Sequence, residues 1–183
     1  MDGARLISFG GKTPLVHASA FVAPGAVLIG DVEIGPEASI WYNCVLRGDV
    51  NRIRVGARTN IQDGSVVHVD SPRPGNESGL PTLIGDDVLI GHMAMVHGCI
   101  LRDRAFVGLG AVVMDGCEIE GGAMLAAGAL LTPGRRIPAG QLWAGRPAKY
   151  VRDLSADELA DQRLGVDHYV ALAKHHATAI RGG

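Results

Sequence analysis

Aromatic residues are scarce in this chain, at 4% of 183 residues, although 47% of all residues are hydrophobic. An excess of charge of either sign is also lacking, since 17 basic and 19 acidic side chains leave a formal net charge of −2. This balance provides no basic surface for nucleic acid, and no run of about 18 apolar residues could span a bilayer. We therefore expect neither a nucleic-acid partner nor a membrane partner.

Cysteine is rare as well. Cys44, Cys99 and Cys117 are an odd set without close pairing, which predicts free, buried thiols in a reducing compartment. The first residues lack a basic start and a long apolar core, so we expect no secretory signal. Together these features favour a cytoplasmic location.

Glycine, in contrast, is abundant at 26 residues, and the large apolar residues recur at a step of six. These apolar anchors are Val16, Val22, Leu28, Ile34, Ile40, Leu46, Val55, Ile61, Val67, Ile84, Ile90, Val96, Leu101, Val107, Val113, Ile119, Leu125, Leu131, Ile137 and Trp143. The step of six is broken at three places: by a slip of three after Leu46, by an insertion after Val67 and by a step of five after Val96. A helix repeats at 3.6 residues and a strand at 2, so a sustained step of six indicates a short strand plus a turn. Three such units would close one coil of about 18 residues, which predicts an all-β solenoid, a parallel β-helix of hexapeptide repeats.

Each repeat has further regular positions. The residue four places after the anchor is usually small, which would let the chain turn a corner of the coil. The residue directly after the anchor is often glycine, and we expect it to supply unusual backbone angles. These glycines are Gly35, Gly56, Gly85, Gly91 and Gly108.

The repeat predicts a β-helix over residues 1–150, with a protruding loop over residues 70–82 that is rich in proline and glycine. We predict that residues 151–183 form a C-terminal α-helix packed on the same domain. Ser155 and Glu158 have the spacing of a capping box at its start. Gly165 interrupts the apolar stripe of this helix.

Two histidines, His68 and His97, each follow an anchor directly. They are 29 residues apart, and removing a loop insertion of about eleven leaves about 18, one full coil. We therefore predict that they lie one above the other, about 4.8 Å apart at the backbone. This arrangement suits two ligands of one metal ion.

His92 precedes His97 by five residues, or about 16 Å of extended chain. Ligand nitrogens around one tetrahedral zinc lie only about 3.3 Å apart, because each bond is about 2.0 Å long. A single chain could hardly bring His92 to the ion held by His68 and His97. We therefore predict a site shared between subunits, which a cyclic trimer would repeat three times.

The alternative for any one histidine is a hydrogen-bonded turn residue without a metal. We interpret His17 in this way, because it lies several coils away from the others. His168, His175 and His176 fall on the terminal helix and are expected to be solvated. The three cysteines are interpreted as core residues, with Cys99 as a less favoured metal ligand.

Three segments carry a family resemblance: residues 40–49 (IWYNCVLRGD), residues 60–65 (NIQDGS) and residues 90–99 (IGHMAMVHGC). They resemble the γ-class carbonic anhydrases and their bacterial homologues, over roughly residues 10–175. The resemblance implies a left-handed parallel β-helix, a homotrimer and three metal sites at subunit interfaces. It assigns His68 and His97 to one subunit and His92 to the next, with zinc as the usual ion and iron or cobalt as substitutes.

The resemblance also implies roles for residues around the metal. Arg47 and Asp49 resemble an ion pair that ties subunits together near the site, although a plain surface pair is the alternative. Gln62 resembles the residue that hydrogen-bonds metal-bound water or bicarbonate.

Three further residues resemble members of the family's site. Asn60 and Asp63 resemble neighbours that orient it, with turn formation as the alternative. Tyr169 resembles a helix tyrosine that approaches the metal, with ordinary packing as the alternative.

The activity that the resemblance implies is reversible hydration of CO2 to bicarbonate by a metal-bound hydroxide at the subunit interface. The chain departs from the best-known family pattern in two places. Val50 stands where that pattern has a glutamate after the Arg-Gly-Asp, and the loop offers only Asp70 and Glu77 as acids. Two alternatives stay open: a metal-dependent acyl-CoA thioesterase or acyltransferase-like protein, and a non-catalytic metal-binding assembly subunit.

Overall fold

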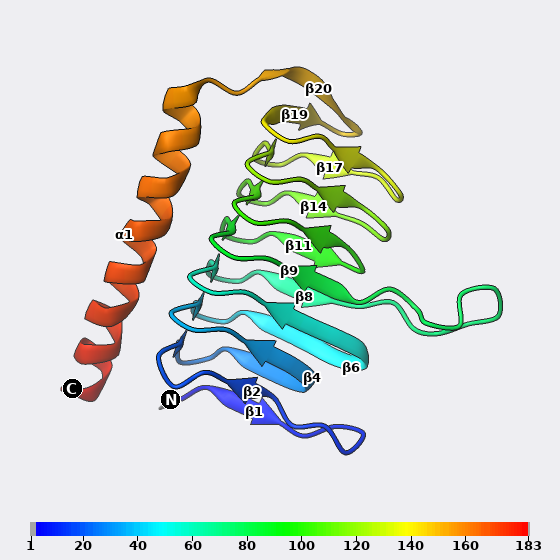
Figure 1. The fold of residues 1–183 in the computed structure, drawn as a ribbon. Helices are drawn as coiled ribbons and strands as arrows, with labels where there is room; N and C mark the ends of the chain where they lie inside the picture. The colour runs from blue at the N-terminus through cyan, green and yellow to red at the C-terminus, as the bar shows by residue number, and fades with distance from the viewer. Residues whose placement is uncertain (1–2, 183) are drawn as a thin grey trace.

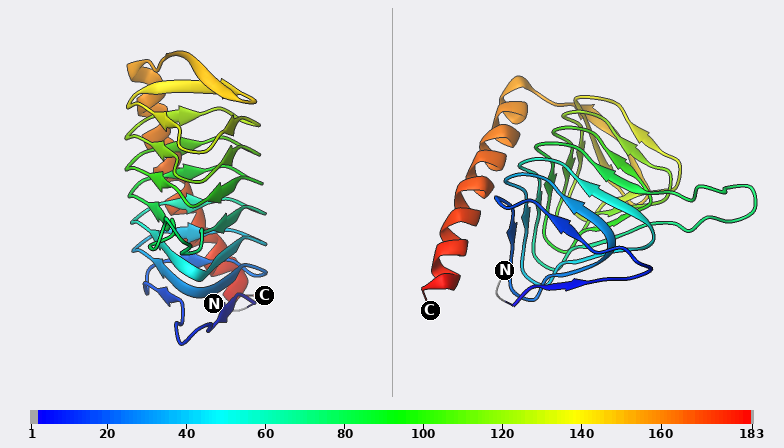
Figure 2. Two further views of the ribbon diagram at one scale, coloured as in Figure 1. Left: turned by 90° about the vertical axis from the view of Figure 1, so that its right-hand side faces the viewer. Right: turned by 60° about the horizontal axis from the view of Figure 1, so that its bottom comes forward.

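A computed structural model describes residues 3–182 of the chain. The backbone winds into stacked coils with a triangular cross-section, and one long helix runs along the outside of the stack (Figures 1 and 2). The elements are β1 (Arg5–Ile7), β2 (Leu15–Val16), β3 (Phe21–Val22), β4 (Val27–Ile34), β5 (Ser39–Ile40), β6 (Val45–Val55), β7 (Asn60–Ile61), β8 (Val66–His68), β9 (Thr82–Ile84), β10 (Leu89–Ile90), β11 (Met95–His97), β12 (Ile100–Leu101), β13 (Phe106–Val107), β14 (Val112–Val113), β15 (Glu118–Ile119), β16 (Met124–Leu125), β17 (Leu130–Leu131), β18 (Arg136–Ile137), β19 (Gln141–Gly145), β20 (Ala148–Asp153) and α1 (Ala156–Arg181).

The strands form two sheets. One has the order β17-β14-β11-β8-β6-β9-β12-β15-β18, and in the same sheet β4 pairs with β6 while β1 and β2 pair with β4. The other has the order β20-β19-β16-β13-β10-β7-β5-β3. Within the regular part of each column, hydrogen-bonded neighbours are three strands apart in the chain, as coils with three faces require. All pairings are parallel except that of β19 with β20, which closes the last coil. The predicted β-helix of hexapeptide repeats with a C-terminal helix is confirmed.

The predicted anchors fill the interior of the coils. Every anchor from Val22 to Ile137 is at most 4% exposed, whereas Val16 and Trp143, at the two ends, are only partly buried. Burying an aliphatic side chain contributes about 1.5 to 3 kcal/mol, so the stack of anchors is the main source of stability. The small corner residues, such as Ala38 and Ala94, are buried beside them.

The expected role of the glycines after the anchors is wrong. None of these five glycines has a positive φ, and the left-handed conformation occurs at other corner positions, such as Met93 with φ 59°. Close approach of neighbouring coils explains them instead. A Cβ on Gly56 would lie 2.4 Å from the carbonyl oxygen of Gly85, and one on Gly91 would lie 2.7 Å from the backbone nitrogen of Leu109.

Helix α1 covers the face formed by β3, β5, β7 and β10. Its capping box is confirmed, because Ser155 and Glu158 each accept a backbone N–H from the other residue. Gly165 also has a packing role, since a Cβ there would lie 3.3 Å from Cδ1 of Leu89. Val166 and Val170 pack against the same leucine. None of the helices within residues 3–182 is long and apolar enough to cross a membrane.

His176 is not solvated as expected, which corrects the interpretation from sequence. Its Nδ1 lies 2.8 Å from the hydroxyl of Tyr42, and its ring packs edge-on to Trp41 at 5.0 Å. The C-terminal half of α1 lies over the early coils, so this histidine faces the prism. His168 and His175 are exposed, as predicted.

Residues 70–81 project from the prism as a long loop (Figure 1), one residue shorter than predicted because Thr82 is buried as the first residue of β9. Isolated bridges between Asp70 and Leu80 and between Arg73 and Asn76 hold its two arms together. The loop leaves the prism directly after β8, so it begins beside His68.

Candidate metal centre

His68 and His97 end two neighbouring parallel strands, β8 and β11. The strand register pairs Val67 with Val96 and His68 with His97. Because both valines point into the core, both histidines emerge on the same outer face. Nδ1 of His68 lies 3.0 Å from Nε2 of His97, so the histidines are stacked as the coil of 18 residues predicts.

Each of these histidines also contacts an aspartate through its other ring nitrogen. Nε2 of His68 lies 3.0 Å from Oδ1 of Asp49, and Nδ1 of His97 is hydrogen-bonded to Oδ1 of Asp115. Arg47 pairs with the second oxygen of Asp49, with Nη1 at 2.6 Å. The carboxylates therefore fix the orientation of both rings.

Burial lowers the pKa of His68, and this effect outweighs the opposing effect of the hydrogen bond that His68 donates to Asp49. Burial alone would raise the pKa of Asp49, but hydrogen bonds from Arg47 and His68 hold this pKa below its usual value. Near neutral pH the pair is thus a neutral imidazole beside a carboxylate. Neutral imidazole is the form that binds metal ions.

Asp115 was not identified from the sequence. It follows His97 by 18 residues, one full coil, which is the spacing that places two residues side by side on adjacent coils. The spacing from His97 is therefore the signal in the sequence that indicates Asp115 as its partner.

His92 lies at a different corner, in the turn between β10 and β11. Its Nδ1 lies 2.8 Å from Oδ2 of Asp63, on the neighbouring coil. The pKa of Tyr169 of α1 is raised by burial and, to a lesser extent, by the charge of Asp63. Tyr169 also packs edge-on to Trp41 at 5.4 Å.

Gln62 and Asn60 lie on the same side of the prism as His92. Gln62 is 7% exposed, and its Nε2 donates to Oδ1 of Asn60 at 3.0 Å. Asn60 is fully buried, and its Nδ2 has no hydrogen-bond partner among the described residues. Because Gln62 donates from Nε2 to Asn60, its side-chain oxygen Oε1 remains able to accept a hydrogen bond.

The predicted site residues thus form two separate groups within one chain. One contains Arg47, Asp49, His68 and His97, and the other contains Asn60, Gln62, Asp63, His92 and Tyr169. Within residues 3–182, no group of three His, Cys, Asp or Glu side chains is placed to hold a metal ion. One chain alone brings together at most two of the three predicted ligands.

The chemistry of the donors fits a divalent transition metal. All three histidines contact a carboxylate through one ring nitrogen, which leaves the other nitrogen as a possible ligand. A carboxylate behind a ligating histidine fixes its tautomer and raises its basicity. Fold and site together define a hexapeptide-repeat protein with a candidate histidine metal centre.

Comparisons with known proteins agree with this class. The chain is 51% identical over 169 residues to gamma carbonic anhydrase 2, mitochondrial, of Arabidopsis thaliana, covering 91% of this chain and 60% of that protein. It is 44% identical over 166 residues to a carbonic anhydrase of Geobacillus kaustophilus, covering 91% of this chain and 87% of that protein. The chain therefore belongs to the γ-class carbonic anhydrase family.

The solved structure of a hexapeptide transferase family protein from Anaplasma phagocytophilum is also similar. It has a TM-score of 0.87 and 46% identity, covering 96% of this chain and 99% of that one. No family model matches the chain. The chain spans only 60 to 64% of the length of three Arabidopsis relatives.

Proposed function

We propose that this protein catalyses the metal-dependent, reversible hydration of CO2 to bicarbonate at sites between the subunits of a homotrimer. The observation that carries the proposal is the set of three histidine–aspartate pairs, His68 with Asp49, His97 with Asp115, and His92 with Asp63. Family membership supports the same activity, because relatives over most of the chain are named carbonic anhydrases. The three free, buried cysteines of this chain are consistent with a cytoplasmic location.

The two groups of site residues support a site shared between subunits. His68 and His97 would hold the ion together with His92 of a neighbouring copy. Apolar side chains around His92 and His97 remain exposed in the single chain, including Met93 at 70% and Leu109 at 52%. Exposed apolar clusters are typical of protein contacts, and a second copy of this chain would cover them.

We propose zinc as the resident ion, with iron or cobalt as substitutes. When bound by three neutral imidazoles, such an ion lowers the pKa of water from 15.7 to about 7 and so makes hydroxide available near neutral pH. In the overall reaction, CO2 and water give bicarbonate and one proton. The oxygen of water bonds to the carbon of CO2, and the proton leaves the site.

Gln62 would orient the reacting groups. Because its Nε2 donates to Asn60, its Oε1 is directed to accept a hydrogen bond from the attacking water or from the hydroxyl of bicarbonate. Asp63 would hold the proton of His92 on Nδ1, which keeps Nε2 free as a ligand. Tyr169 would close the site on the side of α1.

The acids of the loop are poor candidates for carrying the proton away. Asp70 forms an ion pair with Arg73 at 2.5 Å, and Glu77 accepts the backbone N–H of Gly75 at 3.1 Å. Val50, in place of the family's glutamate, cannot accept a proton. We infer that proton release depends on buffer molecules.

Stopped-flow CO2 hydration tests the proposal, with protein loaded separately with zinc, iron or cobalt and a panel of acyl thioesters assayed in parallel. We expect hydration well above the buffer rate with at least one metal, and one ion bound for each chain. A rate equal to buffer with all three metals would overturn the proposal. Thioester hydrolysis in its place would support the acyl-transfer alternative, and inactivity with bound metal would support an assembly role.

A further inference from the structure

A cavity of about 330 Å³ lies between the first half of α1 and the corner turns of the later coils. Leu159, Gln162, Arg163 and Val166 line it from the helix, and Arg104 and Gly140 line it from the coils. Its volume is at the lower end of the range for small-molecule sites. None of the residues of the candidate metal centre lines it, so the cavity is a separate site.

The cavity contains an unsatisfied polar group. Gln162 is only 7% exposed, and its Nε2 has no hydrogen-bond partner among the residues that the structure describes. Buried amide groups in proteins are nearly always hydrogen-bonded, because an unpaired one loses its interactions with water. A ligand with an acceptor atom would satisfy this donor.

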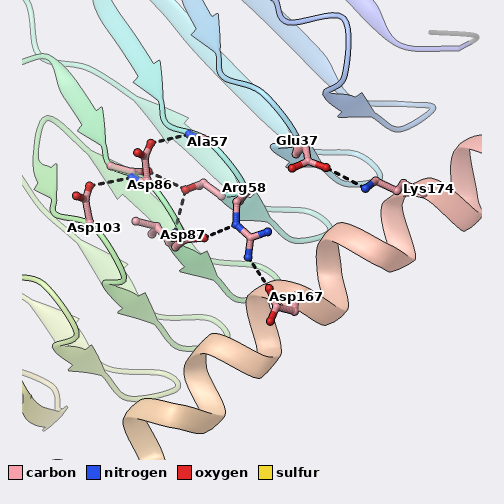
Figure 3. A network of polar contacts seen from close by, with 11 residues as sticks. Glu37, Ala57, Arg58, Asp86, Asp87, Asp103, Asp167 and Lys174 are labelled. Atoms are coloured by element: carbon pink, nitrogen blue, oxygen red, sulfur yellow. Dashed lines mark hydrogen bonds and ion pairs between the residues drawn. The ribbon is translucent and has the colours of Figure 1, made fainter.

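The cavity is lined by two arginines and one aspartate, so positive charge is in excess there. Across residues 3–182, neither Arg104 nor Arg163 forms an ion pair, whereas the lining acid Asp87 is paired with Nε of Arg58 at 2.7 Å. The same guanidinium contacts Asp167 of α1, as Figure 3 shows. Two arginines therefore remain available to an anion.

The other acids near this corner also have partners. Asp86 accepts the backbone N–H of Ala57 at 2.7 Å, and Asp103 accepts that of Asp86 at 2.9 Å (Figure 3). These carboxylates stabilise the stacked turns. Their charges lessen the positive potential without occupying either arginine.

The remaining wall is apolar and open. Leu159 and Val166 contribute aliphatic surface, and a Cβ built on Gly140 would meet no atom within 4 Å. Inorganic phosphate would leave this surface without a partner. A ligand with both an anionic group and an apolar body matches the lining better.

We propose that this cavity binds a small organic carboxylate. The carboxylate accepts hydrogen bonds from Gln162 and from the guanidinium groups of Arg104 and Arg163. The apolar body of the ligand packs against Leu159 and Val166. Binding there would tie the first half of α1 to the prism.

Isothermal titration calorimetry of the metal-loaded protein with benzoate tests this site, with benzamide as the neutral probe of the same shape. We expect saturable binding of benzoate at one site per chain, and about tenfold or greater weakening with benzamide. Arg163→Gln and Gln162→Leu should each weaken benzoate binding by a similar factor. Lys174→Gln is the matched control, because it removes one positive charge from α1 at a distance from the cavity.

His92→Ala separates this proposal from the metal centre, because carboxylates can also bind metal ions. Benzoate binding should survive that substitution. Absence of saturable binding, equal binding of benzamide, or binding lost in His92→Ala but retained in Arg163→Gln would each overturn the proposal. None of these outcomes bears on CO2 hydration, which is measured separately.

Discussion

Nδ1 of His68 lies 3.0 Å from Nε2 of His97. Two ligand nitrogens on one tetrahedral zinc lie about 3.3 Å apart, so the pair is already close to the spacing that a shared ion requires. The register of β8 and β11 fixes this spacing through the buried valines next to each histidine. Two of the three proposed metal ligands are therefore brought together within each chain.

Asp115→Asn should weaken metal binding. The aspartate orients His97 through Nδ1, and loss of such a partner typically reduces metal affinity by about 10 to 100-fold. Competition with a chelator for zinc measures this effect. Asp161→Asn, at an exposed position of α1, is the matched control, and equal affinities in the two variants would contradict the assigned role.

Gln62→Ala should lower kcat while the metal content stays unchanged. The side chain is held by Asn60 and would act on the reacting oxygen, not on the ion. Loss of one oriented hydrogen bond to a reacting group typically costs about 10² to 10³ in kcat. Stopped-flow rates and metal analysis of the same sample provide the comparison, and loss of metal would indicate a structural role for Gln62.

The rate of CO2 hydration at saturating CO2 should rise with the concentration of imidazole buffer. Asp70 is held in an ion pair with Arg73, and Glu77 accepts the backbone N–H of Gly75, so neither loop acid is placed at the proposed metal site. Val50→Glu should raise the rate at low buffer concentration and reduce this dependence. A rate independent of buffer in the unaltered protein would show that another residue carries the proton.

The three cysteines should resist alkylation in the folded protein at pH 8. Burial raises the pKa of Cys44 to about 11, so about one thiol in a thousand is ionised at that pH. Burial also raises the pKa of Cys99 and Cys117. Reactivity toward a thiol reagent should increase as the pH approaches 11 or when urea unfolds the chain, and rapid reaction at pH 8 in the folded state would contradict this packing.

Much of the fold was predictable because one rule, an apolar residue at every sixth position, describes most of the chain. The same rule placed His68 above His97. It could not explain the glycines after the anchors, because their role depends on the distance between coils and not on local backbone angles. Gly91, for example, is required by the approach of Leu109.

Contacts between distant elements were harder to predict. The period of a helix identifies an apolar stripe but not the residues that it meets, so the contact of His176 with Tyr42 was missed. Asp115 was missed although its spacing from His97 is one coil. In the proposed site, His92 meets the other two histidines across two chains. The sequence of one chain indicates this only through the distance between His92 and His97 along the backbone.

The central claim, that each metal site combines two subunits, is tested most directly by mixing two inactive variants. His68→Ala and His92→Ala are unfolded together in equal amounts, refolded and assayed for CO2 hydration. In randomly assembled trimers, an interface has an intact His68 from one chain and an intact His92 from the next in about one quarter of cases. We predict recovery of about a quarter of the unaltered activity, whereas mixed trimers without any recovery would contradict the shared site.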